Sequence, residues 1–202
     1  MREILFATRN TKKLLELKRL MRNSGVKVLS LDMFKDIGEV REDRSTFRGN
    51  AVKKAEQISK IVGKLVLSDD SGLEVPALGY APGVRSARYA GLSQNDDKNI
   101  AKLLKNMLVF TAGKRRARFR CFICISFAGK AIKVVSGAVY GRIALERAGA
   151  NGFGYDSVFI PEGSNKTFAQ ISPGRKDAIS HRAIALEKAK VFILEYFRKC
   201  HL

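Results

Sequence analysis

The chain has 202 residues, 46% of them hydrophobic, which is enough for one domain with a sizeable core. Its 38 Lys and Arg against 19 Asp and Glu give a formal charge of +19, which predicts attraction to phosphorylated molecules or polyanions. No stretch approaches the roughly 20 apolar residues of a membrane-spanning helix, and the apolar part of the N-terminus is too short for a signal peptide. Three cysteines, an odd number, fit a reducing compartment. We therefore expect a soluble, cytoplasmic protein with a single domain, residues 1–202.

The first segment predicts a strand, a polar loop and a helix. Residues 4–6 are apolar and predict a buried strand, and the leucines of residues 14–20 have helical spacing. Asn10 or Thr11 can cap this helix and leave free N–H groups in its first turn, next to Lys12 and Lys13. A helix N-terminus with a nearby cation is a seat for a phosphate. An ordinary capped helix with solvated lysines explains the same residues.

A second strand is expected at residues 26–31, followed by a polar loop and a helix. Phe47, Ala51, Ala55, Ile58 and Val62 form the apolar stripe of this helix, and Gly63 is a stop signal. Asn50 and Lys54 are four residues apart and share a second face, which can look into a cleft. Glu42, in the preceding loop, can reach a metal ion or can simply be a surface residue.

Two adjacent carboxylates dominate the segment KLVLSDDSGLEV. Leu65 to Leu67 predict a short buried strand that ends at Ser68, which places Asp69 and Asp70 just beyond its carboxyl end. Because successive residues of an extended chain point to opposite sides, one Asp can face a cleft while the other bonds nearby groups. A turn with two solvated carboxylates is the alternative.

The middle of the chain predicts an ordered loop at residues 77–91, a helix capped by Ser93, and a hairpin of two strands at 117–127 and 132–140. In the first hairpin strand Arg116, Arg118 and Arg120 alternate with buried residues and should form a solvated basic face. Cys121 and Cys124 fall on opposite faces of that strand, so a redox or zinc site is not expected.

The last third holds candidate groups for a nucleoside. In GANGFGYDSVFIP, Phe153 and Tyr155 can stack on a base and Asp156 can accept a hydrogen bond, although core packing explains both aromatic residues as well. An amphipathic helix with a cap at Ser180 closes the chain. Lys176, His181 and Arg182 cluster near its start, where the helix dipole disfavours cations, and this placement indicates a ligand or an acidic partner. A surface-exposed His-Arg pair is the alternative.

Six motifs in order, ATRNTKK, TFRGNAVKKA, SDDSGLEV, APGVRSARYAG, NGFGYDSVFIP and AISHRAIALEKA, resemble the inosine triphosphate pyrophosphatase family over nearly the whole chain. The resemblance implies an α/β fold in which an elongated mixed sheet is flanked by helices, with two lobes that share this sheet and have a cleft between them. It also implies Mg²⁺-dependent hydrolysis of ITP, dITP and XTP to the monophosphate and diphosphate, and a homodimer.

The resemblance also implies roles for single residues. Asp70 would be the catalytic base and a metal ligand, with Glu42 as the other ligand. The groups that would bind the phosphates are Thr8, Arg9, Asn10, Thr11, Lys12, Lys13, Lys54 and Ser71. Those that would hold the nucleoside and base are Phe153, Gly154, Tyr155, Asp156, Lys176, His181 and Arg182.

The chain departs from the family pattern at two places. Gly49 replaces the Glu of the F-x-E-N-A motif, and the usual E-T-G pattern is Glu42, Asp43 and Arg44 here. The first change is expected to weaken a contact on the helix, and the second leaves Asp43 able to compete with Glu42 for the metal. Two rivals stay open: a basic nucleotide- or RNA-binding protein without turnover, and a pyrophosphatase for modified pyrimidine nucleotides.

Overall fold

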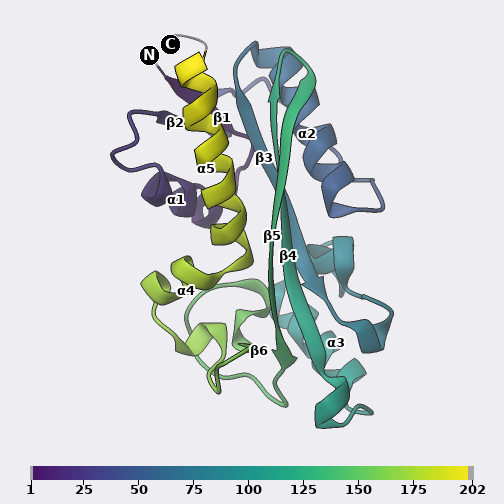
Figure 1. Ribbon diagram of the computed structural model, residues 1–202. Helices are drawn as coiled ribbons and strands as arrows, with labels where there is room; N and C mark the ends of the chain where they lie inside the picture. The colour runs from purple at the N-terminus through teal and green to yellow at the C-terminus, as the bar shows by residue number, and fades with distance from the viewer. Residues whose placement is uncertain (1, 200–202) are drawn as a thin grey trace. The chain divides into compact units, whose positions relative to one another are not determined.

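The structure is a computed structural model that describes residues 2–199 (Figure 1). The strands form a sheet in the order β2-β1-β3-β4-β5-β6, in which β1 is parallel to β2 and β3 while β5 and β6 are antiparallel. The predicted α/β fold with a mixed sheet is thus confirmed. The strands are β1 Glu3–Phe6, β2 Lys27–Ser30, β3 Val66–Glu74, β4 Arg116–Phe127, β5 Lys130–Ile143 and β6 Phe159–Pro161. The helices are α1 Thr11–Leu20, α2 Phe47–Val62, α3 Asp96–Met107, α4 Pro173–Ile179 and α5 His181–Lys199.

The chain divides into two compact units. Unit 1 comprises Met1–Asp70, Cys121–Gly137 and Arg182–Leu202, and unit 2 comprises Ser71–Arg120 and Ala138–His181. Within residues 2–199, no helix combines the length and the apolar character that a membrane span requires.

Helices cover both faces of the sheet in unit 1. On one face, apolar residues of α1 and α5 pack against Phe6 and Leu67; on the other, Ile58 of α2 packs against Leu5 and Val66. This alternation follows from the two-residue period of a strand. Figure 1 shows α5 and α2 on opposite sides of β3. Each buried side chain of this size stabilises the fold by about 1.5–3 kcal/mol.

The ends of α2 and α5 follow the sequence signals. Thr46 caps α2 by accepting a hydrogen bond from the N–H of Gly49, and α2 ends at Gly63, whose φ of 61° is the left-handed conformation that glycine adopts without strain. The closing helix begins at His181, directly after Ser180 as predicted. The preceding helix α4, capped by Ser172, was not predicted.

β3 is longer than predicted, so the sequence-based end at Leu67 was wrong. The strand continues to Glu74 through Ser68, Asp69 and Asp70. Polar residues can continue a buried strand here because they find partners: the hydroxyl of Ser68, for example, donates to the carbonyl of Ala51 on α2. The two carboxylates therefore lie inside a strand, not beyond its carboxyl end.

The hairpin of β4 and β5 is confirmed, with its turn at Ala128 and Gly129, which have φ values of 50° and 79°. Cys121 and Cys124 are buried free thiols in two different apolar clusters, as expected for opposite faces of a strand. Burial raises the pKa of each thiol to about 12, which makes both unreactive.

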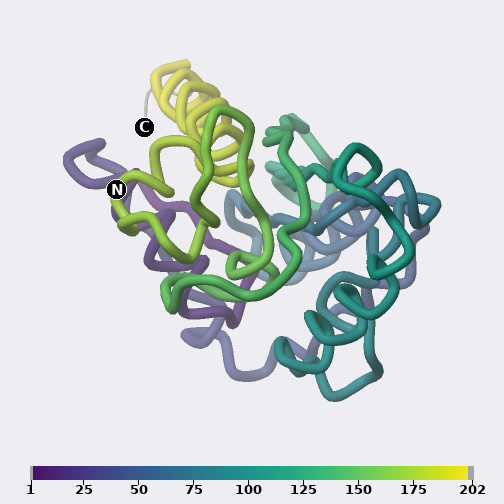
Figure 2. Tube along the Cα trace, turned by 90° about the horizontal axis from the view of Figure 1, so that it is seen from below, coloured from purple at the N-terminus to yellow at the C-terminus, as the bar shows by residue number. Residues whose placement is uncertain are grey.

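Unit 2 has its own core, in which Phe119, Phe159 and Phe168 contact one another at ring-centroid distances of 4.7–6.1 Å. α3, the teal coil in Figure 2, packs on the 3-10 turns at Gly83–Arg88 and Gly154–Ser157. Its cap is Asn95, whose side chain accepts from the N–H of Lys98, so the prediction of Ser93 as cap was wrong by two residues.

Arg115 is an internal residue of unit 2. It is buried, and its guanidinium donates to the carbonyls of Met107, Ile143 and Ala144 at 2.7–2.9 Å. Arg115 forms no ion pair within residues 2–199, and burial lowers the pKa of this arginine. Arg115 is therefore a structural residue within the most basic stretch of the sequence.

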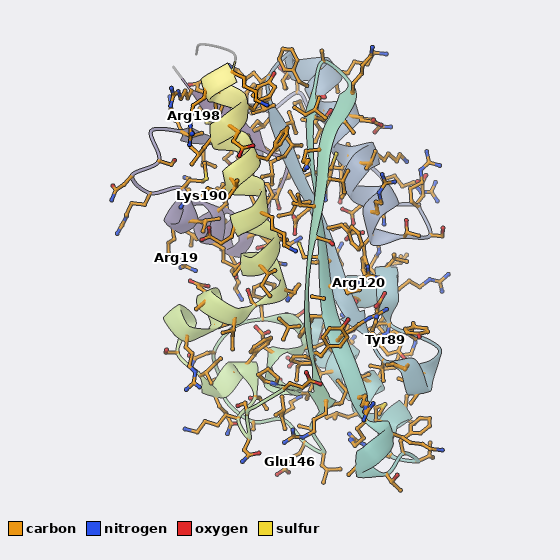
Figure 3. All side chains as sticks on the ribbon, in the orientation of Figure 1. Arg19, Tyr89, Arg120, Glu146, Lys190 and Arg198 are labelled. Carbon is orange, nitrogen blue, oxygen red and sulfur yellow. The ribbon has the colours of Figure 1, made fainter. Side chains whose placement is uncertain are left out.

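Some of the other cations lie on the surface. Figure 3 shows the side chains of Arg19 on α1 and of Lys190 and Arg198 on α5 on the outer side of their helices. On β4, the predicted alternation of buried and outward residues is confirmed, and Arg118 forms an ion pair with Glu74 at 2.5 Å. This arrangement fits a solvated basic surface.

Candidate active site

The two aspartates of β3 have different environments. Asp69 is fully buried, and its carboxylate lies 2.9 Å from Nζ of Lys13 and 3.4 Å from Nε of Arg182. Asp70 faces α2, where Nδ2 of Asn50 donates to its Oδ2 at 2.9 Å. The expectation that the two would have separate roles is consistent with these separate partners.

Asp69 is an ionised anchor. Burial alone would raise its pKa, but the charges of Lys13, Arg182 and Lys54 hold it well below the ordinary value. Its Oδ1 has no hydrogen-bond partner among the described residues. Asp69 therefore stays negative at any physiological pH and fixes the surrounding cations in place.

Asp70 has the opposite property. Burial, and next the negative charge of Glu42, raise its pKa to about 6, while the hydrogen bond from Asn50 opposes the shift. A carboxylate that titrates near neutral pH is a better proton acceptor than a free aspartate with a pKa of about 3.9. Asp70 is thus suited to act as a general base.

Glu42 and Lys54 are joined at this site. Nζ of Lys54 lies 2.6 Å from Oε1 of Glu42 and also donates to the backbone carbonyl of Asp69 at 2.7 Å. Burial lowers the pKa of Lys54, but the charges of Asp69 and Glu42 more than offset this and keep it above its usual value. Asn50 and Lys54 do share one face of α2, as their spacing predicted, and that face meets the carboxylates.

The donor set fits a hard divalent cation. Glu42 and Asp70 are close enough for one charge to raise the pKa of the other carboxyl, and a cation between them would relieve this repulsion. Within residues 2–199 no three His, Cys, Asp or Glu side chains converge on one point. Mg²⁺ is commonly held by one or two carboxylates together with water and substrate phosphates, so two suffice.

The N-terminus of α1 has Asn10 as its cap, one of the two residues predicted for that position. Its side chain accepts from the N–H groups of both Lys12 and Lys13 at 3.0 and 3.2 Å. We expected free N–H groups in this first turn, but those of Lys12 and Lys13 are occupied, because an Asn side chain reaches two donors of the turn. Thr11 and Lys12 are exposed, whereas Lys13 turns inward to Asp69.

Thr8 and Arg9 connect β1 to this helix. Thr8 is buried, and its hydroxyl accepts from the N–H of Asn10 at 3.1 Å. The guanidinium of Arg9 donates to the carbonyl of Ile37 at 2.7 Å and to Asp32 at 3.3 Å. Through these two contacts Arg9 holds the segment that follows β2 in place.

The buried side chain of Arg182 binds two carboxylates. Besides Asp69, its Nη1 lies 3.0 Å from Oε2 of Glu16 on α1. The charges of these two carboxylates offset the effect of burial and raise the pKa of the guanidinium. Arg182 thus links the start of α5 to α1 and to β3.

Three of the predicted nucleoside-binding residues come together in unit 2. Nζ of Lys176 on α4 lies 2.5 Å from Oδ2 of Asp156 and 4.8 Å from the ring centroid of Phe153. The N–H of Phe153 donates to the same carboxylate at 2.8 Å, and the N–H of Gly154 donates to Asp96. Phe153, Asp156 and Lys176 therefore form one preorganised polar and aromatic cluster.

The remaining predicted residues are placed as follows. Tyr155 is buried and donates its hydroxyl to the carbonyl of Ser86, which favours core packing over base stacking. His181 is also buried, stacked on Phe119 with ring centroids 4.7 Å apart and planes 8° apart. Ser71 follows Asp70 in β3 and is half-buried.

Sequence reasoning missed several supporting residues. Glu16, Asn50 as the partner of Asp70, and Lys53, whose Nζ lies 2.8 Å from Asp43, were not assigned these contacts. Only the spacing of Asn50 and Lys54 carried a local signal, because the partners of the other groups lie far away along the chain.

Comparison with known proteins confirms the family resemblance. The model of the Ham1 family matches residues 4–192. The dITP/XTP pyrophosphatases of Bacillus licheniformis and Bacillus subtilis are 47% and 44% identical; the matches cover 96% and 93% of this chain and 98% and 95% of the relatives. The solved structure of a HAM1 protein from Coxiella burnetii has a TM-score of 0.90 at 37% identity, covering 96% of this chain and 100% of that one. The solved structure of the Staphylococcus aureus Ham1 protein has a TM-score of 0.86 at 40% identity, and the match covers 95% of this chain and 98% of that one. The chain belongs to the Ham1 family.

Proposed function

We propose that this protein hydrolyses the non-canonical purine nucleoside triphosphates dITP, XTP and ITP to the monophosphate and diphosphate, and so removes deaminated purines from the nucleotide pool. The observation that carries the proposal is the buried Asp70, whose pKa is raised to about 6 beside Glu42. Relatives of nearly the same length that are 40–47% identical bear the name dITP/XTP pyrophosphatase, which supports the substrate class.

Asp70 is the proposed base. It accepts a proton from the attacking water, whose oxygen bonds to phosphorus while the bridging P–O bond breaks and diphosphate leaves. Glu42 and Asp70 would hold Mg²⁺, which when bound neutralises phosphate charge and acidifies the water. Asn50 donates to Oδ2 of Asp70 and so helps to fix the orientation of this carboxylate.

The phosphates are proposed to bind the segment Thr8–Lys13, Ser71 and Lys54. Lys13 and Lys54 are already ordered by Asp69 and Glu42, so their charges are in place before the substrate arrives. Such preorganised cations stabilise the charge that develops on the leaving diphosphate.

The nucleoside is proposed to bind Phe153–Asp156, Lys176, His181 and Arg182. Phe153 offers a ring face for the purine, with Lys176 and Asp156 fixed beside it. Hydrogen-bond donors at His181 or Arg182 would suit a 6-oxo group, whereas the amino group of adenine would face donors. This arrangement predicts that ATP is a poor substrate.

We further propose that the protein is a cytoplasmic homodimer, as the family resemblance implies. The buried free thiols of Cys121 and Cys124 accord with a reducing compartment. Light scattering on the eluting protein measures the mass, and a value near the 22.4 kDa of one chain would contradict the dimer.

The decisive experiment is diphosphate release from a panel of triphosphates with Mg²⁺. We expect dITP, XTP and ITP to be cleaved with kcat/KM at least a hundredfold above that of ATP, and modified pyrimidine triphosphates to be poor substrates. Equal cleavage of ATP would refute the base selectivity. Absent turnover together with tight, salt-sensitive RNA binding would favour the rival binding protein.

A further inference from the structure

The loop that carries Glu42 is held residue by residue by the side chains of α2. Residues 38–44 have no regular secondary structure. Nevertheless Lys53 binds the carbonyl of Arg41 at 3.0 Å and the carboxylate of Asp43 at 2.8 Å, on either side of Glu42. Lys54 binds Glu42 itself at 2.6 Å.

Asn50 holds the end of the same segment. Its Oδ1 accepts from the N–H of Arg44 at 2.8 Å, while its Nδ2 donates to Asp70. Four consecutive loop residues, 41–44, are therefore each bound by a side chain of α2, and the last of these contacts leads directly to the proposed base. We call residues 41–44 the tethered segment.

Gly49 lets the tethered segment approach the helix. A Cβ atom at position 49 would lie 3.0 Å from Cβ and 3.3 Å from Cγ of Arg44, closer than side chains normally pack. Arg44 of the tethered segment and Gly49 of α2 therefore form one close contact between the loop and the helix.

We propose that Lys53 is a positioning residue that fixes the tethered segment on α2, so that Glu42 faces the metal while Asp43 is kept away from it. The side chain of Lys53 is only 17% exposed, and it spans the residues before and after Glu42, so rotation of the segment would break both of its contacts. Asp43, engaged by this lysine, is not the metal ligand. The inference deepens the proposed function and rests on it for the identity of the metal site.

The first experiment measures the tether without metal or substrate. Amide hydrogen exchange of the Arg44 N–H, followed by NMR, is expected to be at least tenfold faster in Lys53→Met and in Asp43→Thr. The double variant should exchange no faster than Lys53→Met, because both changes break the contact between Lys53 and Asp43, and Lys53→Met alone already breaks the contact to Arg41 as well. Lys60→Met, on an exposed lysine of the same helix, is the matched control and should leave the exchange rate unchanged.

Unchanged exchange in Lys53→Met, or equal acceleration in Lys60→Met, would overturn the assignment. This readout needs no turnover, so it can be interpreted even if the proposed function is wrong. Faster exchange of the Arg44 N–H in Lys53→Met, together with no cleavage of dITP by the unaltered protein, would refute the proposed function and support the positioning role of Lys53. Circular dichroism of each variant checks that it is folded.

The second experiment asks which carboxylate binds the metal. Glu42→Gln and Asp43→Asn remove one negative charge at neighbouring positions, and each new amide can still accept a hydrogen bond from its lysine. Free Mn²⁺ measured by electron paramagnetic resonance should show at least tenfold weaker binding for Glu42→Gln and less than threefold weaker binding for Asp43→Asn. Equal losses, a larger loss for Asp43→Asn, or no binding by the unaltered protein would each contradict the assignment.

Discussion

Asp69 and Asp70 are consecutive residues of β3, yet their side chains bind partners from opposite faces of the sheet: Lys13 and Arg182 on one, Asn50 on the other. The two-residue period of a strand accounts for this. The same period gives them opposite electrostatic roles, since Asp69 is surrounded by cations and Asp70 faces Glu42.

Replacement of Asp69 should damage stability. In Asp69→Asn the buried Arg182 and the largely buried Lys13 lose a charged partner, and breaking a buried ion pair costs about 3–5 kcal/mol. Urea unfolding at pH 7 measures the change in the free energy of unfolding. A loss below about 1 kcal/mol would show that Asp69 is not the anchor.

Asp70→Asn should abolish turnover and yet stabilise the metal-free protein at neutral pH. The pKa of Asp70 is raised to about 6 in the folded protein, above the value of a free aspartate, so folding is accompanied by proton uptake between about pH 4 and pH 6. The ionised Asp70 therefore opposes folding most strongly above pH 6. The stability gain of the variant should be near zero at pH 4, grow as the pH rises to 6, and level off at about 1–3 kcal/mol. Urea unfolding at several pH values tests this, and a gain that is the same at pH 4 and pH 7 would refute it.

Local patterns predicted the elements, whereas the contacts at the site depended on distant parts of the chain. The stop at Gly63, the hairpin turn and the shared face of Asn50 and Lys54 all follow from spacing over a few residues. The length of β3 did not, because its buried polar residues Ser68, Asp69 and Asp70 are tolerated through partners on α1, α2 and α5. Arg182 is 113 residues from Asp69, and nothing between them signals the pair.

Arg115 should stabilise unit 2 without taking part in the reaction. Arg115→Met removes hydrogen bonds to three carbonyls, those of Met107, Ile143 and Ala144. At about 1 kcal/mol or more for each buried acceptor left unpaired, we expect a loss of about 3 kcal/mol. Thermal unfolding measures it, and kcat for dITP at a temperature where the variant is folded should stay within twofold of the original value.

Phe153→Leu tests the proposed base contact. Leucine keeps much of the apolar volume but lacks the ring face that lies 4.8 Å from Nζ of Lys176. Loss of stacking worth about 1–3 kcal/mol per base should raise KM for dITP about tenfold, with kcat nearly unchanged. If steady-state kinetics show an unaltered KM, Phe153 does not contact the base.

Gly49→Ala should fail to stabilise α2, contrary to the usual effect of this change in a helix. Alanine normally gains about 0.5–1 kcal/mol over glycine there, but at this position its Cβ would press on Cβ of Arg44 at 3.0 Å. We expect a loss of about 0.5 kcal/mol in the unaltered background and no net loss in Arg44→Gly, where the side chain of Arg44 is gone but the hydroxyl of Thr46 would still lie 3.1 Å from the new Cβ. The resulting coupling of about 0.5 kcal/mol lies within the range found for residues in contact. A double-mutant cycle by chemical denaturation measures it, and additive effects would mean that residues 44 and 49 do not touch in solution.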